Sequence, residues 1–182
     1  MLLLTPVQTV SAQKLQGYII TNQLDTLYGT IKIPSPMFEH MAYFQVNFRD
    51  KHNNKRIYSP DELIAYHVSG NHFVSNSINK SGTNRKFLKL LQNGYCTLYE
   101  YKYLGTTYGV PGGVSGSSYA KLAHYAQKKG GDLHELIFRK LKNGKDLYFV
   151  DNGQLTFDIK TGKYKKHQLQ DIVSRYNIEM KR

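Results

Sequence analysis

The chain has 182 residues, and its 25 Lys and Arg against 13 Asp and Glu give a formal net charge of +12. A hydrophobic content of 40% excludes wholesale disorder, because that much apolar side chain can bury a core. The single cysteine, Cys96, excludes an intramolecular disulfide and zinc sites built on paired cysteines. The charge favours an anionic partner such as nucleic acid, lipid or acidic polysaccharide, although a solvated basic surface explains it without any partner.

Residues 1–12 have the features of the end of an export signal. Apolar residues are followed by Val10-Ser11-Ala12, which resembles the pattern that signal peptidase reads before a cut, here ahead of Gln13. We therefore expect a signal-peptide remnant over 1–12, export to the periplasm or the outer membrane, and a single β-rich domain over 13–182. An ordinary N-terminal strand or tail in a cytoplasmic protein is the alternative, because the stretch is short and has no Lys or Arg before it. No stretch reaches the roughly 20 apolar residues of a membrane-spanning helix, so we expect no transmembrane segment.

Alternating apolar and polar residues predict two successive hairpins at the start of the domain. The abundance of Tyr (15 residues) and Phe (8 residues), with no Trp, also favours β structure. Turn formers at 22–25 and 50–55 separate the alternating runs, and Pro34 ends one of them. The predicted strands lie at 17–21, 26–33, 42–49 and 56–58.

Shorter elements are predicted in the middle of the chain. Ser59-Pro60-Asp61-Glu62 has the form of a single helical turn, with a capping serine, a proline and acidic residues in order. Short strands follow at 63–68 and 73–78, and the polar composition of 75–85 indicates a loop. Residues 87–91 fit either a short helix or a strand entering a hairpin.

The clearest strand, Tyr95–Leu104, interleaves aromatic rings with positive charge. Such a strand is a candidate binding surface, because bases and sugar rings stack on exposed aromatic side chains. The candidate residues are Tyr99, Tyr101, Lys102 and Tyr103. The alternative is a tyrosine face packed against a neighbouring sheet or helix, and the alternation does not decide which face is buried.

Two further hairpins and one helix are predicted in the last third of the chain. Gly130-Gly131 and Asp151-Asn152-Gly153 are hairpin-type turn sequences. The strands that flank them lie at 119–127, 133–138, 147–150 and 154–159. The helix is indicated by apolar residues that recur every three or four positions, namely Leu169, Ile172, Val173 and Tyr176. The predicted fold is mainly β (α+β), an antiparallel hairpin meander with one C-terminal helix, whose sheet is either open or a partly closed barrel or roll.

The Gly/Ser-rich segment 105–118 is the natural place for a flexible loop. Its glycines are not followed by the lysine that a P-loop requires. Ser115 lies one position out of register for the G-x-S-x-G pattern of a nucleophile. The segment therefore gives no sign of a phosphate site or of a catalytic serine.

The seven histidines do not form a metal-binding pattern. His67 and His72 lie across a predicted turn, and His124 and His134 are placed to face each other across a predicted hairpin. A catalytic zinc site needs three converging ligands, and H-E-x-x-H is absent from the sequence. We therefore predict no metal site, no cofactor and no catalytic residue.

The N-terminal hairpin resembles the start of a group of uncharacterised exported proteins of Gram-negative bacteria. Those proteins read G-Y-I-x-T-x-x-G-D-T-L-x-G-x-I just after a signal peptide, and this chain has Gly17-Tyr18-Ile19-Ile20-Thr21 and Asp25 to Ile31 in the same order. The likeness extends loosely over the first 104 residues. Leu24 stands where glycine is usual, which puts a tight turn there in doubt. The resemblance implies export and a β-rich fold, and it implies no activity.

Together these features predict an exported, non-enzymatic binding or structural module of the cell envelope. Its partner would be an envelope protein or an anionic polymer. One alternative is an enzyme of unrecognised class with a site under the loop 105–118. The other is a basic nucleic-acid-binding protein, which an exported location disfavours.

Overall fold

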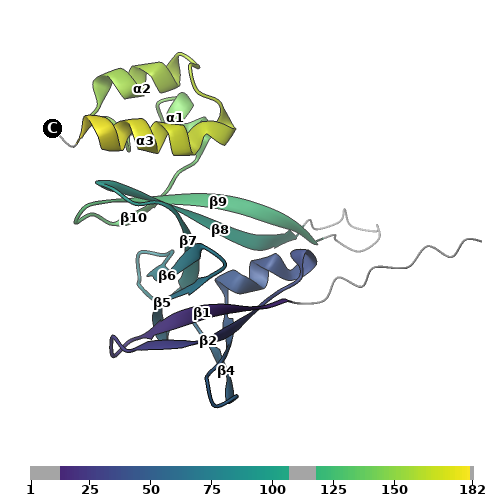
Figure 1. Cartoon of the computed structure of the whole chain (residues 1–182). Helices are drawn as coiled ribbons and strands as arrows, with labels where there is room; N and C mark the ends of the chain where they lie inside the picture. The colour runs from purple at the N-terminus through teal and green to yellow at the C-terminus, as the bar shows by residue number, and fades with distance from the viewer. Residues whose placement is uncertain (1–12, 107–117, 181–182) are drawn as a thin grey trace, which may run out of the picture.

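The computed structural model describes residues 13–106 and 118–180, and its main feature is one ten-stranded antiparallel sheet (Figure 1). The signal-peptide remnant expected at 1–12, and all but the ends of the loop expected over 105–118, lie outside the described residues. The strands are β1 (Gln13–Thr21), β2 (Thr26–Ile33), β3 (Val46–Arg49), β4 (Lys55–Tyr58), β5 (Leu63–Val68), β6 (Asn71–Ser77), β7 (Arg85–Gln92), β8 (Cys96–Thr106), β9 (Ser118–Lys128) and β10 (Leu133–Glu135).

The sheet consists of two meanders. Strands β1 to β4 lie side by side in sequence order, as do β5 to β10, and the meanders join where β1 pairs with β5. Strands β4 and β10 form its two edges, so the sheet is open and not a closed barrel. The predicted mainly β fold of antiparallel hairpins is thus confirmed, and the ambiguous segment 87–91 belongs to a strand, β7. The loop predicted over 75–85 begins later, because β6 continues to Ser77.

Two glycines allow neighbouring strands to approach closely, β1 to β5 and β2 to β3. Gly17 and Gly29 are directly opposite each other in β1 and β2. A Cβ atom on Gly17 would lie 2.3 Å from the His67 carbonyl oxygen, and one on Gly29 would lie 2.2 Å from the Arg49 carbonyl oxygen. Atoms at those distances overlap, so any larger residue would force the strands apart.

The turn between β1 and β2 is tight even though Leu24 replaces the usual glycine. Leu24 has a φ of 69°, and its N–H donates to the Thr21 carbonyl at 3.0 Å. The Thr21 N–H in turn donates to the Asp25 carbonyl at 3.0 Å, which closes the turn. Leucine at this position therefore leaves the turn in place and adopts the left-handed conformation.

Two hydrophobic cores share the wall formed by β8 and β9. The inner core fills the concave side of the sheet and contains Ile19, Phe48, Tyr66, Phe73 and Phe87, among other buried residues. The second core contains Cys96, Leu98 and Ala126 from the opposite face of β8 and β9, together with side chains of the C-terminal helices. Strand β8 is consequently buried on both faces over the first half of its length, and Cys96 is completely buried.

The C-terminal helices lie on one side of β8, β9 and β10, with the rest of the sheet on the other side (Figure 1). They are α1 (Phe138–Lys142), α2 (Gly153–Lys160) and α3 (Leu169–Glu179), with a 3₁₀ turn, η2 (Lys166–Gln168), before α3. The predicted C-terminal helix is confirmed, since Leu169, Ile172, Val173 and Tyr176 are buried in the second core. We call residues 138–180 the helical unit.

The predicted hairpin around Asp151-Asn152-Gly153 is wrong. Asn152 is instead the N-cap of α2, and its side-chain oxygen accepts a hydrogen bond from the Leu155 N–H at 3.0 Å. Asn-Gly fits either a hairpin turn or a helix start, and burial of Leu155 and Ile159 on one helix face decides for the helix.

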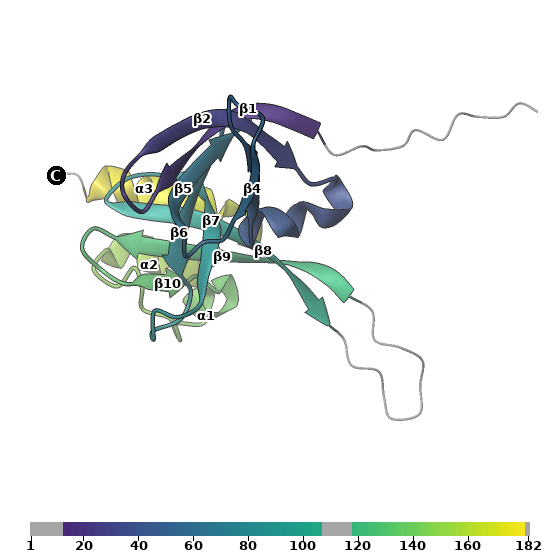
Figure 2. The ribbon, with the colours of Figure 1, turned by 90° about the horizontal axis from the view of Figure 1, so that it is seen from below.

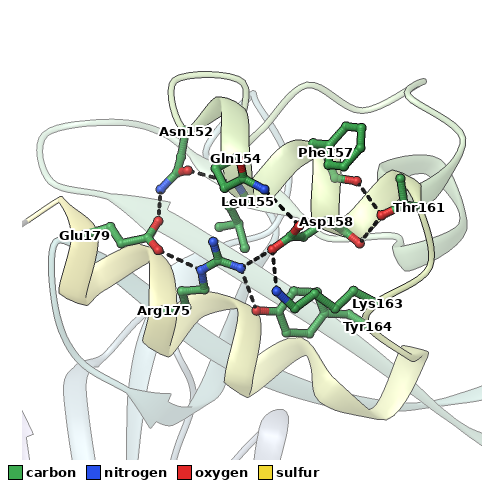
Figure 3. Close-up of polar contacts among 10 residues, drawn as sticks. All are labelled: Asn152, Gln154, Leu155, Phe157, Asp158, Thr161, Lys163, Tyr164, Arg175 and Glu179. Atoms are coloured by element: carbon green, nitrogen blue, oxygen red, sulfur yellow. Dashed lines mark hydrogen bonds and ion pairs between the residues drawn. The ribbon is translucent and has the colours of Figure 1, made fainter.

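A network of ion pairs holds α2 and α3 together (Figure 3). The Asp158 carboxylate accepts from Arg175, from Lys163 at 2.8 Å and from Gln154 at 3.0 Å, and Arg175 also donates to Glu179 at 2.7 Å. The Arg175 and Lys163 donors lower the pKa of Asp158 to about 2. The network therefore keeps its charges throughout the physiological pH range and fixes the two helices side by side.

The 3₁₀ helix η1 (Pro36–Tyr43) replaces the first part of the strand predicted at 42–49. It packs against β7 and β8, which places Tyr43 in the inner core. The Tyr43 hydroxyl donates to the Glu100 Oε1 atom at 2.7 Å. The alternating residues at 42–45 therefore do not belong to a strand: η1 ends at Tyr43, and β3 begins at Val46. None of the helices in the described part of the chain has the length and apolar character needed to cross a bilayer.

Candidate binding cleft

The tyrosines that the sequence marked as a binding surface lie mostly in the interior. Tyr99 and Tyr101 are only 7% and 5% exposed and belong to the inner core. Burial raises the pKa of Tyr101 to about 12. Tyr103, which is half-buried, stacks on Tyr101 with ring centroids 5.4 Å apart. These rings pack on one another and on the core, which is the alternative that the sequence left open.

Lys102 points away from that stack and is held by acidic groups. Its ammonium lies 2.8 Å from a Glu39 carboxylate oxygen and 3.7 Å from a Glu100 oxygen. The pKa of Lys102 is raised by these carboxylates against the opposing effect of burial. Lys102 thus ties η1 to β8 and is not part of a continuous platform with the three tyrosines.

Of the two histidine pairs that the sequence placed across turns, only one is directly opposed in the structure. His67 and His72 are directly opposite each other in β5 and β6, with ring centroids 6.3 Å apart. His134 instead pairs with Ala126, so His124 is offset from it by one step of the hydrogen-bonded ladder. Within residues 13–106 and 118–180, no three His, Cys, Asp or Glu side chains come together in a way that would hold a metal ion.

A cleft of about 1100 Å³ lies beside the edge strand β10. We refer to it below as the cleft. Three stretches of chain form its walls: the β6–β7 loop at 76–82, the β9–β10 hairpin at 125–135, and the segment 137–148 that follows β10. Figure 2 shows the sheet curving back so that β6 and β7 lie near β10, and the chain continues from β10 directly into the segment 137–148.

The cleft is lined by groups of every chemical type in roughly equal measure. Its cationic side chains are Lys80, Lys140 and Lys145, and its carboxylates are Asp132, Glu135 and Asp146. Amide groups come from Asn76, Asn79 and Gln127, and apolar surface comes from Ile78, Leu133, Ile137 and Leu147. The lining is therefore balanced in charge although the chain carries +12, so the cleft does not have the potential that selects a polyanion.

A rigid aromatic and polar cluster forms one wall of the cleft. The His134 imidazole stacks on the Tyr148 ring, with centroids 4.7 Å apart and planes 15° from parallel. The His134 Nε2 atom lies 3.0 Å from the Asp146 Oδ2 atom, and the Asp146 Oδ1 atom accepts from the Tyr148 N–H at 3.1 Å. The Asp146 side chain is 7% exposed and that of His134 is 42% exposed, so the histidine faces the opening.

This cluster is built to position groups rather than to activate a nucleophile. A catalytic triad needs a hydroxyl or thiol on the histidine nitrogen that does not contact the carboxylate. Among the described residues, the polar partner of the His134 ring is Asp146. Burial raises the pKa of the Cys96 thiol, so that this group stays protonated and inert.

The Tyr148 wall is braced from behind by a second group of contacts. Its hydroxyl lies 3.9 Å from the Cys96 Sγ atom, and the Lys128 ammonium lies 4.9 Å from its ring centroid. Lys128 also forms a 2.8 Å ion pair with Asp151, which accepts from the Tyr176 hydroxyl at 2.6 Å. These contacts join β8, β9 and the helical unit, so the wall does not depend on the loops alone.

The sequence did not reveal the cleft, because the 76–82 loop that forms one wall lies more than 40 residues before the continuous stretch 125–148 that forms the others. The sequence placed His134 opposite His124, and the structure pairs it with Asp146 instead. The alternative site under the loop 105–118 falls on residues that are largely outside the described chain.

Comparison of the chain with protein-family models, with curated proteins and with solved structures finds no significant match. The chemistry of the site therefore stands on the geometry alone.

Proposed function

We propose that the protein is an exported, non-enzymatic binding module of the cell envelope, and that the cleft holds its partner. One observation carries the proposal. A cleft of about 1100 Å³, as large as the largest small-molecule sites, is walled by a rigid sheet edge and a braced aromatic cluster. Large concave surfaces are the usual location of binding sites, and the polar groups fixed in this wall can orient a partner.

The composition of the lining favours one of the two partner classes expected from the sequence. An anionic polymer would be met by three carboxylates as well as three lysines. An envelope protein, whose surface mixes apolar, polar and charged groups, matches the lining better. The remaining positive charge of the chain lies largely outside the cleft and supplies a non-specific attraction to anionic surfaces.

Export is supported by the Val10-Ser11-Ala12 pattern and by the resemblance of the N-terminal hairpin to exported proteins. It is tested by expressing the native gene in a Gram-negative host and sequencing the N-terminus of the periplasmic fraction. We expect a mature chain that begins at Gln13. Retention of the uncleaved chain in the cytoplasm would contradict the export part of the proposal.

Binding is tested by recording amide spectra of the ¹⁵N-labelled protein during titration with three probes. The probes are soluble muropeptides, heparin as a polyanion, and a pool of random linear dodecapeptides. We expect shifts concentrated at 132–135 and 145–148 with the peptide pool, and no such concentration with heparin or with the muropeptides. Absence of cleft shifts with all three probes would refute the proposed binding role.

A matched pair of variants links any shifts to the cleft. Leu147 is 56% exposed and lines the cleft, whereas Val150 is 60% exposed and does not line it. Leu147→Arg should weaken binding of the active probe at least tenfold, and Val150→Arg should leave it within threefold. Equal effects of the two changes would place the binding surface elsewhere.

A further inference from the structure

Resting on the proposed function, we infer that the cleft binds its partner by strand addition: an extended polypeptide segment pairs with the open edge of β10 and becomes an eleventh strand. The occupant is thus a segment of another protein in extended conformation, held by main-chain hydrogen bonds. Such pairing is a recurrent way of binding peptides at exposed sheet edges.

The hydrogen-bond pattern of the β9–β10 hairpin shows which groups of β10 are available. The Leu136 N–H donates to the His124 carbonyl at 2.8 Å, and the same register pairs His134 with Ala126. In an antiparallel ladder only every second residue turns its N–H and C=O toward the partner strand. Leu133 and Glu135 therefore direct their N–H and C=O groups away from β9, along the edge that borders the cleft.

The opposite edge of the sheet, β4, carries positive charge that β10 lacks. In β4 the outward-directed residues are Lys55 and Ile57, because the Asp50 N–H donates to the Asn54 carbonyl and sets the register. Lys55 and Arg56 are exposed on that strand, and charged residues on an edge discourage pairing. The outward residues of β10 are instead Leu133, which is half-buried, and Glu135.

The cleft also supplies contacts for alternate side chains of an added strand. On one face of β10, Leu133 packs toward the inner core, and Ile78 of the facing loop packs against the same core. On the other face lie the His134 ring and the Tyr148 ring on which it stacks. Alternate residues of the bound segment would therefore meet an aliphatic wall and an aromatic wall. The balanced charge of the cleft favours a segment of low net charge.

A selection of phage-displayed linear dodecapeptides on the full-length protein supplies the probe, and a proline scan of the edges tests the binding mode. Glu135→Pro removes an N–H that does not bond to β9, so the hairpin is retained. We expect it to weaken the selected peptides at least tenfold, while Glu135→Ala, which keeps the N–H, stays within threefold. Ile57→Pro makes the same change on the β4 edge and should have no effect.

Hydrogen exchange of the wild-type protein keeps the test independent of the folding of any variant. Saturating peptide should slow exchange of the Leu133 and Glu135 amides at least tenfold. Failure to enrich any peptide, equal affinity for Glu135→Pro, or unprotected amides would each overturn strand addition. A different result separates the two proposals. If a probe shifts the signals of 145–148 while the β10 amides exchange as fast as before, strand addition is wrong and the proposed binding role of the cleft still stands.

Discussion

Replacement of Asn177 by alanine should strongly destabilise the contact between the sheet and the helical unit. The Asn177 amide, which is 5% exposed, acts as a substitute for a neighbouring strand. Its oxygen accepts from the Cys96 N–H at 2.6 Å, and its nitrogen donates to the Cys96 carbonyl at 2.8 Å. These backbone groups need such a partner because the β7–β8 pairing shifts register and ends at Leu98.

The magnitude follows from what the substitution leaves behind. Cys96 is 0% exposed, so its N–H and C=O would lose their partners without gaining water. Each unsatisfied buried group costs about 1–3 kcal/mol, and alanine returns roughly 0.6 kcal/mol through its better helix propensity. The two groups together cost about 2–6 kcal/mol, so we expect Asn177→Ala to lower the free energy of unfolding by about 1.5–5 kcal/mol, with about 2–4 kcal/mol as the central range.

Urea unfolding followed by circular dichroism measures this loss, and Cys96 provides a second measurement in the native state. Its thiol is the one cysteine of the chain and is reached by a thiol reagent when the contact opens. If the contact between the sheet and the helical unit opens about 2–4 kcal/mol more easily, the reagent should modify the Cys96 thiol roughly 30-fold to nearly 1,000-fold faster. Ile178→Ala changes the adjacent residue, which is 68% exposed, and serves as the control. A loss below 1 kcal/mol in Asn177→Ala, with unchanged thiol reactivity, would refute the role of the amide as a strand substitute.

Three further changes test local features. Gly29→Ala should lower the free energy of unfolding, measured in urea, by about 1–3 kcal/mol, because the added Cβ would lie 2.7 Å from the Phe48 ring. A loss under about 0.5 kcal/mol would show that β2 and β3 can separate freely. Leu24→Gly should raise the free energy of unfolding by roughly 0.5–1 kcal/mol. It removes about 1–2 kcal/mol of left-handed backbone strain, part of which is offset by the larger entropy of glycine in the unfolded chain, and the exposed Leu24 side chain loses little burial. A destabilised variant would contradict this. Burial, with a smaller effect of the His67 charge, lowers the pKa of His72, so the folded state disfavours protonation and stability should fall as pH drops below about 6.5. The fall between pH 8 and pH 5 should be smaller in His72→Gln, and an identical fall in both proteins would show that His72 is not responsible.

The fold was largely predictable because alternation along a strand reports which side faces a core. Residues 26–33 alternate and form β2, and the apolar spacing at 169–176 gives α3. Prediction failed where one local sequence fits two structures. Asn152-Gly153 begins the helix α2 instead of forming a hairpin turn. Only the burial of Leu155 in the second core distinguishes the helix from the hairpin. Residues 42–45 alternate in sequence, yet η1 continues to Tyr43 and β3 begins only at Val46.

The candidate site was less predictable for a related reason. Tyr99 and Tyr101 have the amphipathic character of binding residues, yet they face the inner core because the sheet curves around them. Curvature is a property of the whole sheet and leaves no mark in a single strand. It also brings the 76–82 loop to β10, so the cleft depends on a distance between segments that no local pattern encodes.

The wall shared by the two cores limits how this chain can be divided for expression. A fragment that stops at Lys128 would present Cys96, Leu98 and Ala126 to solvent as an apolar strip, since the helical unit normally covers them. A fragment that starts after Lys128 would lack the face of β8 and β9 on which its helices pack. Boundaries for shortened versions therefore belong at the two ends of the sequence, and a tag or fluorescent label is better placed at a terminus than between the sheet and the helices.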